Sequence, residues 1–154
     1  MEKHIPVLLN ETIELLNINK NGIYVDMTLG GGGHSEAILN LLEKGKLYGF
    51  DQDIFAIEKA SERLSEYKNF TAINANFYNA KEKLVEIGIN EVDGIIFDLG
   101  VSSFQFDIPE RGFSYRYDAP LDMRMDQQAN LDAYHVVNNY SFEDLIKIFF
   151  EYGE

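Results

Sequence analysis

A run of four glycines between an apolar segment and a helical pattern constrains the fold of this chain most. Residues Ile23–Met27 predict a strand, Gly30–Gly33 follow, and the helical pattern begins at about Ser35. Glycine accepts positive φ and lets another group approach the main chain, so four in succession indicate a ligand lying on the turn. The alternative is a tight turn that needs small residues, for which one or two glycines would suffice.

The glycine turn does not identify its ligand by itself. A phosphate loop ends in Gly-Lys-Ser/Thr, whereas His34 and Ser35 stand here after Gly33. Gly30 and Gly32 match the start of the dinucleotide pattern G-x-G-x-x-G, but Ser35 occupies its third glycine position. Nucleoside ligands without a pyrophosphate remain, and S-adenosylmethionine comes first among them.

A carboxylate ends the next predicted strand, 46–51. Asp51 lies about 20 residues beyond the last glycine, the distance at which an acid at the end of a second strand accepts hydrogen bonds from ribose hydroxyls. The alternative is an ordinary solvated Asp ahead of a helix, with Asp53 as the cap of that helix. After the glycine turn, the ribose interpretation is favoured.

Strands and helices alternate up to residue 98. Predicted strands lie at 23–27, 46–51, 70–74 and 92–98, and predicted helices at 10–16, 35–43, 54–67 and 80–87. Asn10 is the expected cap of the first helix, and Gly45 and Gly88 are expected to end the second and fourth. This alternation predicts an α/β fold with a doubly wound parallel sheet in the order 3-2-1-4, whose ligands collect at the carboxyl ends of the strands.

Composition narrows the class of protein. The 154 residues fit one ordinary domain, and 45% hydrophobic residues argue against disorder. Without cysteine there is no disulfide framework, which makes a cytoplasmic location the default. No apolar run reaches the length of a membrane span, and no signal peptide is visible. His4, His34 and His135 have no metal-ligand spacing, so neither a membrane nor a metal is expected.

The net charge of −13 fits poorly with nucleic acid as a partner, because proteins contact phosphates through Lys and Arg. Arg111, Arg116 and Arg124 nevertheless fall in one short segment. They form either a patch that faces the substrate or structural ion pairs. The available carboxylates are those of Glu110, Asp118, Asp122 and Asp126.

Beyond residue 98 the pattern changes. Residues 99–128 show no sustained period but are rich in aromatic residues, which argues for a functional loop and against disorder. Helices are predicted at 131–137 and 142–152. Ser141 and Asp144 resemble a capping box ahead of the last helix, and Gly153 is its expected C-cap.

Several motifs together resemble the bacterial small-subunit ribosomal RNA methyltransferase H family, over essentially the whole chain. They are His4–Leu8, Thr28–Ser35, Asp98–Ser103, Glu110–Ser114 and Pro120–Asp126, of which the last two are long and idiosyncratic. Members use S-adenosylmethionine to methylate the exocyclic N4 of a cytidine in the decoding centre of 16S ribosomal RNA. The resemblance therefore implies a class I methyltransferase sheet, this cofactor and this RNA partner.

The resemblance also implies a set of site residues. Gly32, Gly33 and His34 would contact the cofactor, Asp51 would hold its ribose, Phe77 would lie against the adenine, Asp98 would sit beside the methionine end, and Gln105 would add a polar contact. Asp98 is also the candidate catalytic residue, as an acceptor for the cytosine amine. The alternative for Phe77 is a core aromatic at a helix start, and for His34 a helix-start residue with a solvent-facing ring.

The chain departs from this family in length, since members are about twice as long. Residues 1–105 would form the cofactor-binding half and 106–154 a signature loop and the beginning of an inserted helical domain, a truncated form expected to be inactive alone. The exposed edge of the fourth strand would then favour a homodimer. The competing functions are another nucleoside-cofactor enzyme, such as a dehydrogenase, and a non-catalytic acidic interaction domain.

Overall fold

The computed structural model describes residues 6–153. The chain divides into two compact units, Met1–Gly100 and Val101–Glu154. The predicted loose arm, with His4 and Ile5 of the first motif, lies outside the described residues. The boundary at Gly100 falls a few residues before the division after residue 105 that the sequence suggests. Each unit is described by itself below.

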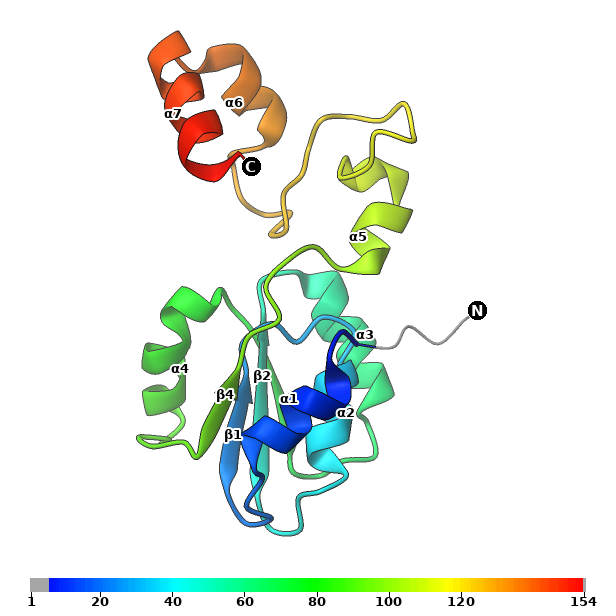
Figure 1. The fold of residues 1–154 in the computed structure, drawn as a ribbon, viewed down its shortest axis with the longest axis vertical. Coiled ribbons are helices and arrows are strands. Elements are labelled where there is room, and N and C mark those ends of the chain that lie inside the picture. Colours follow the sequence, from blue (N-terminus) through cyan, green and yellow to red (C-terminus); the bar gives the residue numbers. More distant parts are fainter. Residues whose placement is uncertain (1–5, 154) are drawn as a thin grey trace. The chain divides into compact units, whose positions relative to one another are not determined.

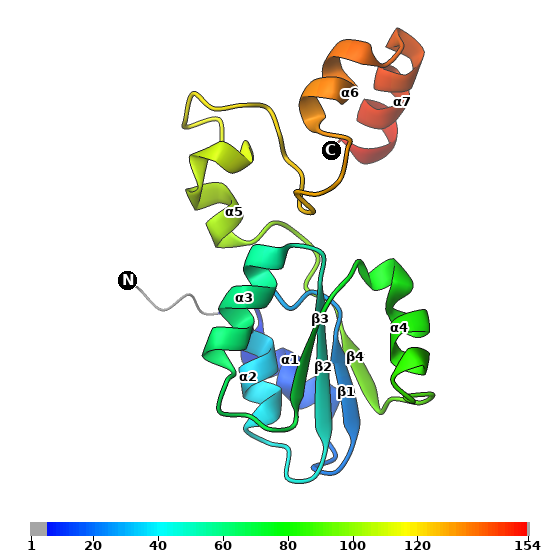
Figure 2. The ribbon, with the colours of Figure 1, turned by 180° about the vertical axis from the view of Figure 1, so that it is seen from behind.

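The first unit is built on a parallel sheet of four strands, drawn in Figures 1 and 2. The strands are β1 (Ile23–Asp26), β2 (Lys46–Asp51), β3 (Phe70–Asn74) and β4 (Gly94–Ile96). Their order is β3-β2-β1-β4, which confirms the predicted order and fold class. β4 is shorter than predicted, because beyond it the amide of Asp98 donates to the side chain of Thr28 and not to a strand.

Helices cover both faces of this sheet, as a doubly wound fold requires. They are α1 (Leu9–Leu16), α2 (Gly33–Leu39), α3 (Ile54–Arg63), the short 3₁₀ helix η1 (Phe77–Asn79) and α4 (Ala80–Glu86). In Figures 1 and 2, α1, α2 and α3 lie on one side of the sheet and α4 on the other.

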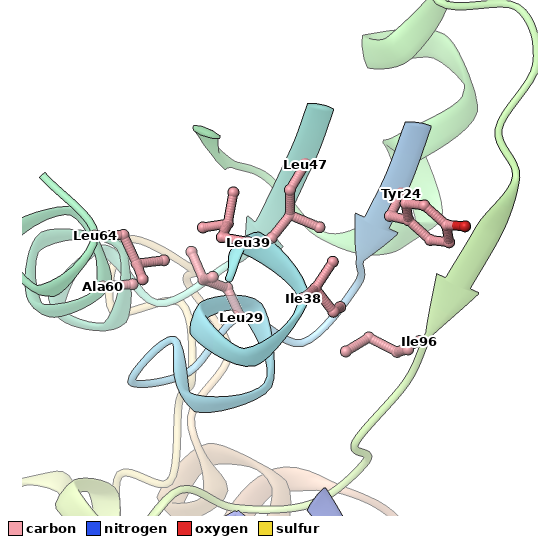
Figure 3. Close-up of a cluster of buried hydrophobic side chains, with 8 residues drawn as sticks. All are labelled: Tyr24, Leu29, Ile38, Leu39, Leu47, Ala60, Leu64 and Ile96. Atoms are coloured by element: carbon pink, nitrogen blue, oxygen red, sulfur yellow. The ribbon is translucent and has the colours of Figure 1, made fainter. Parts of the chain in front are cut away.

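Two hydrophobic clusters follow from the alternation of side chains along the strands. Tyr24 and Leu47 point to the first cluster, shown in Figure 3, where they meet residues of α2 and α3 such as Ile38 and Ala60. Their chain neighbours Val25 and Tyr48 point the other way, into a second cluster against α4. Because the central strands β1 and β2 are buried on both faces, their carboxyl ends are held by packing from two sides.

Several predicted helix boundaries are wrong; α3, for example, ends at Arg63 and not at residue 67. Asn10 does not cap α1, because the helix already begins at Leu9 and its N-cap is Leu8, in the left-handed conformation and without a side-chain cap. α2 ends at Leu39, so Gly45 does not close it. Gly45 instead packs against the carbonyl of Gly22, where a Cβ would overlap. Gly88, with φ of 81°, follows α4 as predicted.

The second unit contains α5 (Ser103–Asp107), the 3₁₀ helix η2 (Pro109–Arg111), α6 (Ala133–Asn139) and α7 (Phe142–Tyr152). α7 has the predicted bounds: Ser141 Oγ accepts the amide hydrogen of Asp144 at 3.1 Å, and Gly153 is the C-cap. The sequence did not predict α5, because five residues are too short to show a helical period. Within residues 6–153, no helix has the length and apolar character needed to cross a membrane.

Candidate functional site

The glycine turn lies at the carboxyl end of β1, and its glycines have separable roles. Gly30 and Gly32 have φ of 49° and 75°, values that side chains rarely adopt. A Cβ at Gly32 would lie 3.1 Å from Leu64 Cδ1, and one at Gly33 would overlap the ring of Pro6. At Gly31 a Cβ would meet nothing within 4 Å. Packing within the protein therefore accounts for Gly32 and Gly33, while the turn is open at Gly31.

Asp51, at the carboxyl end of β2, ties this turn to the next helix. Its Oδ2 accepts the amide hydrogen of Gly30 at 2.9 Å, and its Oδ1 accepts that of Asp53 at 2.9 Å. Burial raises the pKa of Asp51, opposed by these backbone hydrogen bonds. Asp53 caps α3 by accepting from Phe55, as the alternative interpretation had it. Asp51 itself is not simply solvated, and each of its oxygens keeps a lone pair for a ligand hydroxyl.

The sequence reasoning missed a third carboxylate, Asp26. Its side chain is buried, with 1% of the residue exposed, and accepts from Ser35 Oγ at 2.7 Å and from the amide of Thr28 at 3.1 Å. Burial raises the pKa of Asp26 to about 6, although the hydrogen bond from Ser35 opposes this. A carboxylate inside the apolar strand, four residues ahead of the first glycine of the turn, was the available signal. Asp26 fixes the turn to the start of α2.

His34 lies at the start of α2 with only 8% of its surface exposed, so the alternative of a solvent-facing ring is wrong. Its Nε2 is 3.1 Å from the carbonyl oxygen of Val7, and because a carbonyl only accepts, Nε2 carries the hydrogen. In the neutral ring Nδ1 is then a bare acceptor. It faces Asp98 Oδ2 at 3.8 Å.

Asp98 follows β4 and is held by its main chain. The Asp98 amide donates to Thr28 Oγ1 at 2.7 Å, which joins the end of β4 to the glycine turn. The carboxylate is left 52% exposed and available to a ligand. The structure thus brings the predicted residues Gly32, His34, Asp51 and Asp98 to one edge of the sheet.

Phe77, the residue expected beside an adenine, begins η1 and is 41% exposed. The alternative of a core aromatic is therefore wrong, although the helix start is correct. Its ring meets that of Phe97 edge-on, with centroids 5.6 Å apart. Half-exposed and braced on one side, the Phe77 ring offers an apolar surface to a planar ligand.

Gln105 belongs to the second unit and is 4% exposed. Its Oε1 accepts the amide hydrogen of Ser102 at 3.0 Å, which caps α5. Its expected cofactor contact stays a prediction.

The three clustered arginines divide between the two roles considered for them. Arg124 Nη2 pairs with Asp122 Oδ2 at 2.6 Å, and this hydrogen bond lowers the pKa of Asp122. Arg111 is buried and donates to the carbonyl oxygens of Arg124 and Met125. Both are structural. Arg116 is exposed and makes no ion pair with any residue in 6–153.

Among the described residues, no group of His, Asp and Glu side chains is arranged to hold a metal ion. The groups at the sheet edge suit an organic ligand. They are a glycine turn open at Gly31, the Asp51 carboxylate with remaining lone pairs, and the half-exposed ring of Phe77.

The family model of the MraW methylases matches residues 1–154. The chain belongs to the MraW methylase family. This confirms the resemblance drawn from the motifs.

Solved structures similar to this MraW-family chain include three methyltransferase-fold proteins. An rRNA methylase from Streptococcus thermophilus is 29% identical, with a TM-score of 0.51 over 64% of this chain and 58% of its own. A protein from Streptococcus mutans, described as a methyltransferase in complex with SAH, is 25% identical, with a TM-score of 0.51 over 65% and 56%. NSun6 from Pyrococcus horikoshii, solved with SFG, is 25% identical, with a TM-score of 0.50 over 61% and 24%. The chain spans little more than half of the first two relatives.

Proposed function

We propose that this chain carries the S-adenosylmethionine-binding part of an enzyme that methylates the exocyclic N4 of a cytidine in 16S ribosomal RNA. Membership of a methylase family supports methyl transfer, and an rRNA methylase among the structural relatives supports an RNA substrate. The neighbour with bound SAH supports the cofactor, because SAH is what S-adenosylmethionine becomes after it gives up its methyl group. The cytosine-N4 position rests on the motif resemblance.

The observation that carries the proposal is the convergence of Asp51, Asp98 and the open glycine turn at one sheet edge. Asp51 would accept the ribose hydroxyls with its remaining lone pairs, and Phe77 would cover the adenine. The Asp98 carboxylate would lie near the positive sulfonium of the cofactor. When bound, S-adenosylmethionine supplies an activated methyl group, so the protein has to supply alignment.

A cytosine amine is a weak nucleophile, because its lone pair is delocalised into the ring. An acceptor that holds an amine hydrogen turns the nitrogen towards the methyl group. Asp98 Oδ2 and the Leu99 carbonyl are the candidate acceptors, and the bare Nδ1 of His34 lies beside that carboxylate. A proton released from the amine would therefore reach a pair of acceptors already 3.8 Å apart.

Calorimetric titration separates this function from its competitors. Binding of S-adenosylmethionine but not NAD is the expected result. Preference for NAD would favour a dehydrogenase, and binding of neither would favour a non-catalytic interaction domain.

The substitution Asp98→Asn tests the catalytic role of Asp98. It is made in a protein that contains this chain and transfers methyl groups to immature small ribosomal subunits. The amide keeps an acceptor but loses the charge, so single-turnover transfer with saturating cofactor should fall roughly 10²-fold or more. If only cofactor affinity changes, Asp98 is a binding residue and the amine acceptor lies elsewhere.

A further inference from the structure

A hollow of about 400 Å³ lies within the second unit, between α5 and the loop that follows η2. Four aromatic residues and two opposite charges line it: Phe106, Phe113, Tyr115, Tyr117, Arg116 and Asp107. None of these residues was predicted as part of the cofactor site, and the role proposed above uses none of them. A volume of about 400 Å³ lies in the range of small-ligand sites.

Most of the aromatic rings that line this hollow are exposed to solvent rather than packed in a core. Tyr115 is 99% exposed, and Phe106 and Tyr117 are about half exposed. Phe113 is held from behind, since the guanidinium of the buried Arg111 lies 6.0 Å from its ring centroid. The supported ring of Phe113 and the exposed rings beside it therefore offer flat apolar faces. Such faces bind unpaired bases by stacking.

The two charges complement different parts of a nucleotide. Arg116 has an exposed guanidinium that pairs with no carboxylate in residues 6–153, unlike Arg124. It can meet a phosphate as a two-pronged donor. Asp107 is also exposed, and its carboxylate repels phosphate. A carboxylate in a base-binding hollow can instead accept a hydrogen from an exocyclic amine, as on cytosine.

We propose that this hollow binds one unstacked nucleotide of single-stranded RNA, with the base against the aromatic rings and the phosphate on Arg116. Asp107 makes the hollow prefer bases with an exocyclic amine. The inference rests on the proposed function, because that function makes RNA the partner. It goes further by naming where and how this unit holds the RNA.

The test uses the intact chain and two labelled RNA hexamers, oligo(C) and oligo(U), followed by fluorescence anisotropy at low salt. Oligo(C) should bind more tightly than oligo(U), which lacks an exocyclic amine. Tyr115→Leu should weaken oligo(C) binding roughly 5-fold or more, the scale of one lost base stack. Arg116→Gln should weaken both RNAs, and Asp107→Asn should shrink the difference between them.

Matched controls are Tyr152→Leu and Lys147→Gln, which change an exposed ring and an exposed cation on α7, away from the hollow. Both should leave RNA binding unchanged. Since Tyr115 is almost fully exposed, its variant should keep the wild-type melting temperature. Equal losses in test and control variants, or equal binding of both RNAs, would overturn the proposal. S-adenosylmethionine titration of the same samples shows separately whether the cofactor proposal holds, because no cofactor residue is changed.

Discussion

The most heavily buried carboxyl group of the site, that of Asp26, should make stability depend on pH. Its pKa is raised by burial from 3.8 to about 6, so the folded chain holds the proton more tightly than the unfolded chain. Stability contributed by the protonated group is therefore lost as the pH rises from about 3.8 to about 6. The difference corresponds to roughly 3 kcal/mol of unfolding free energy.

Asp26→Asn removes the charge and keeps an oxygen for the Thr28 amide, while the Ser35 hydroxyl can turn to accept from the new amide group. The variant should be more stable than wild type at pH 7 and equal to it near pH 4. Urea unfolding at both pH values measures this. Equal pH dependence in the two proteins would show that another group titrates.

The second residue-scale prediction concerns Asp51, which has a structural and a binding role. Asp51→Asn keeps an acceptor for one of the two amides but loses the charge facing a ribose. Loss of a charge-assisted hydrogen bond should weaken S-adenosylmethionine binding by roughly 1.5–3 kcal/mol, measured by calorimetry. Asp53→Ala is the matched control, since it removes the α3 cap at a cost of about 1 kcal/mol in stability. An unchanged dissociation constant in Asp51→Asn would remove Asp51 from the site.

Sequence reasoning brought candidate residues to one sheet edge but did not identify their hydrogen-bond partners. Asp51 could be predicted because the distance from a glycine turn to the second strand end is characteristic of nucleotide-binding halves. The buried role of Asp26 could not, since its neighbours Ser35 and Thr28 become partners only after the turn closes. The contact between Nδ1 of His34 and Asp98 depends on a packing angle that no local pattern encodes.

At the scale of elements, apolar runs predicted the strands, and the bounds of β2 and β3 were correct. β2 is central and buried on both faces, and β3, at the edge, pairs with β2 along its whole length. The errors lie where few hydrogen bonds fix the backbone. Examples are the start of α1, the end of α2 and the five-residue α5. β4 was overestimated because the apolar residues Val92 and Phe97 extend the sequence pattern beyond both ends of the ladder.

β4 should also determine how the chain associates. Within the described residues it pairs only with β1, so its other edge is open, and Ile95 and Phe97 are 46% and 53% exposed. An open apolar edge pairs with other strands. We expect concentration-dependent association in light scattering, which Ile95→Lys should reduce. A wild-type chain that stays monomeric at high concentration would contradict this.

At the scale of the whole molecule, the net charge of −13 sets the response to salt. Proteins that contact many phosphates lose RNA affinity steeply with salt, in proportion to the number of contacts. Here an acidic chain would meet phosphate mainly through Arg116. The slope of log affinity against log salt should therefore be shallow, about one or less in magnitude. A slope several times steeper would reveal a basic surface that the described residues do not explain.

The hydrogen bond from the Asp98 amide to Thr28 also has a consequence for the order in which the protein matures. It joins residues 70 positions apart, and β4, which precedes Asp98, is the last of the four described strands to leave the ribosome. A nascent chain that has made β1, β2 and β3 contains the glycine turn and Asp51 but lacks Asp98, which we propose lies beside the cofactor. Binding of the cofactor during synthesis would therefore indicate that the first unit has been completed. A ligand bound at that moment would favour the folded state by mass action.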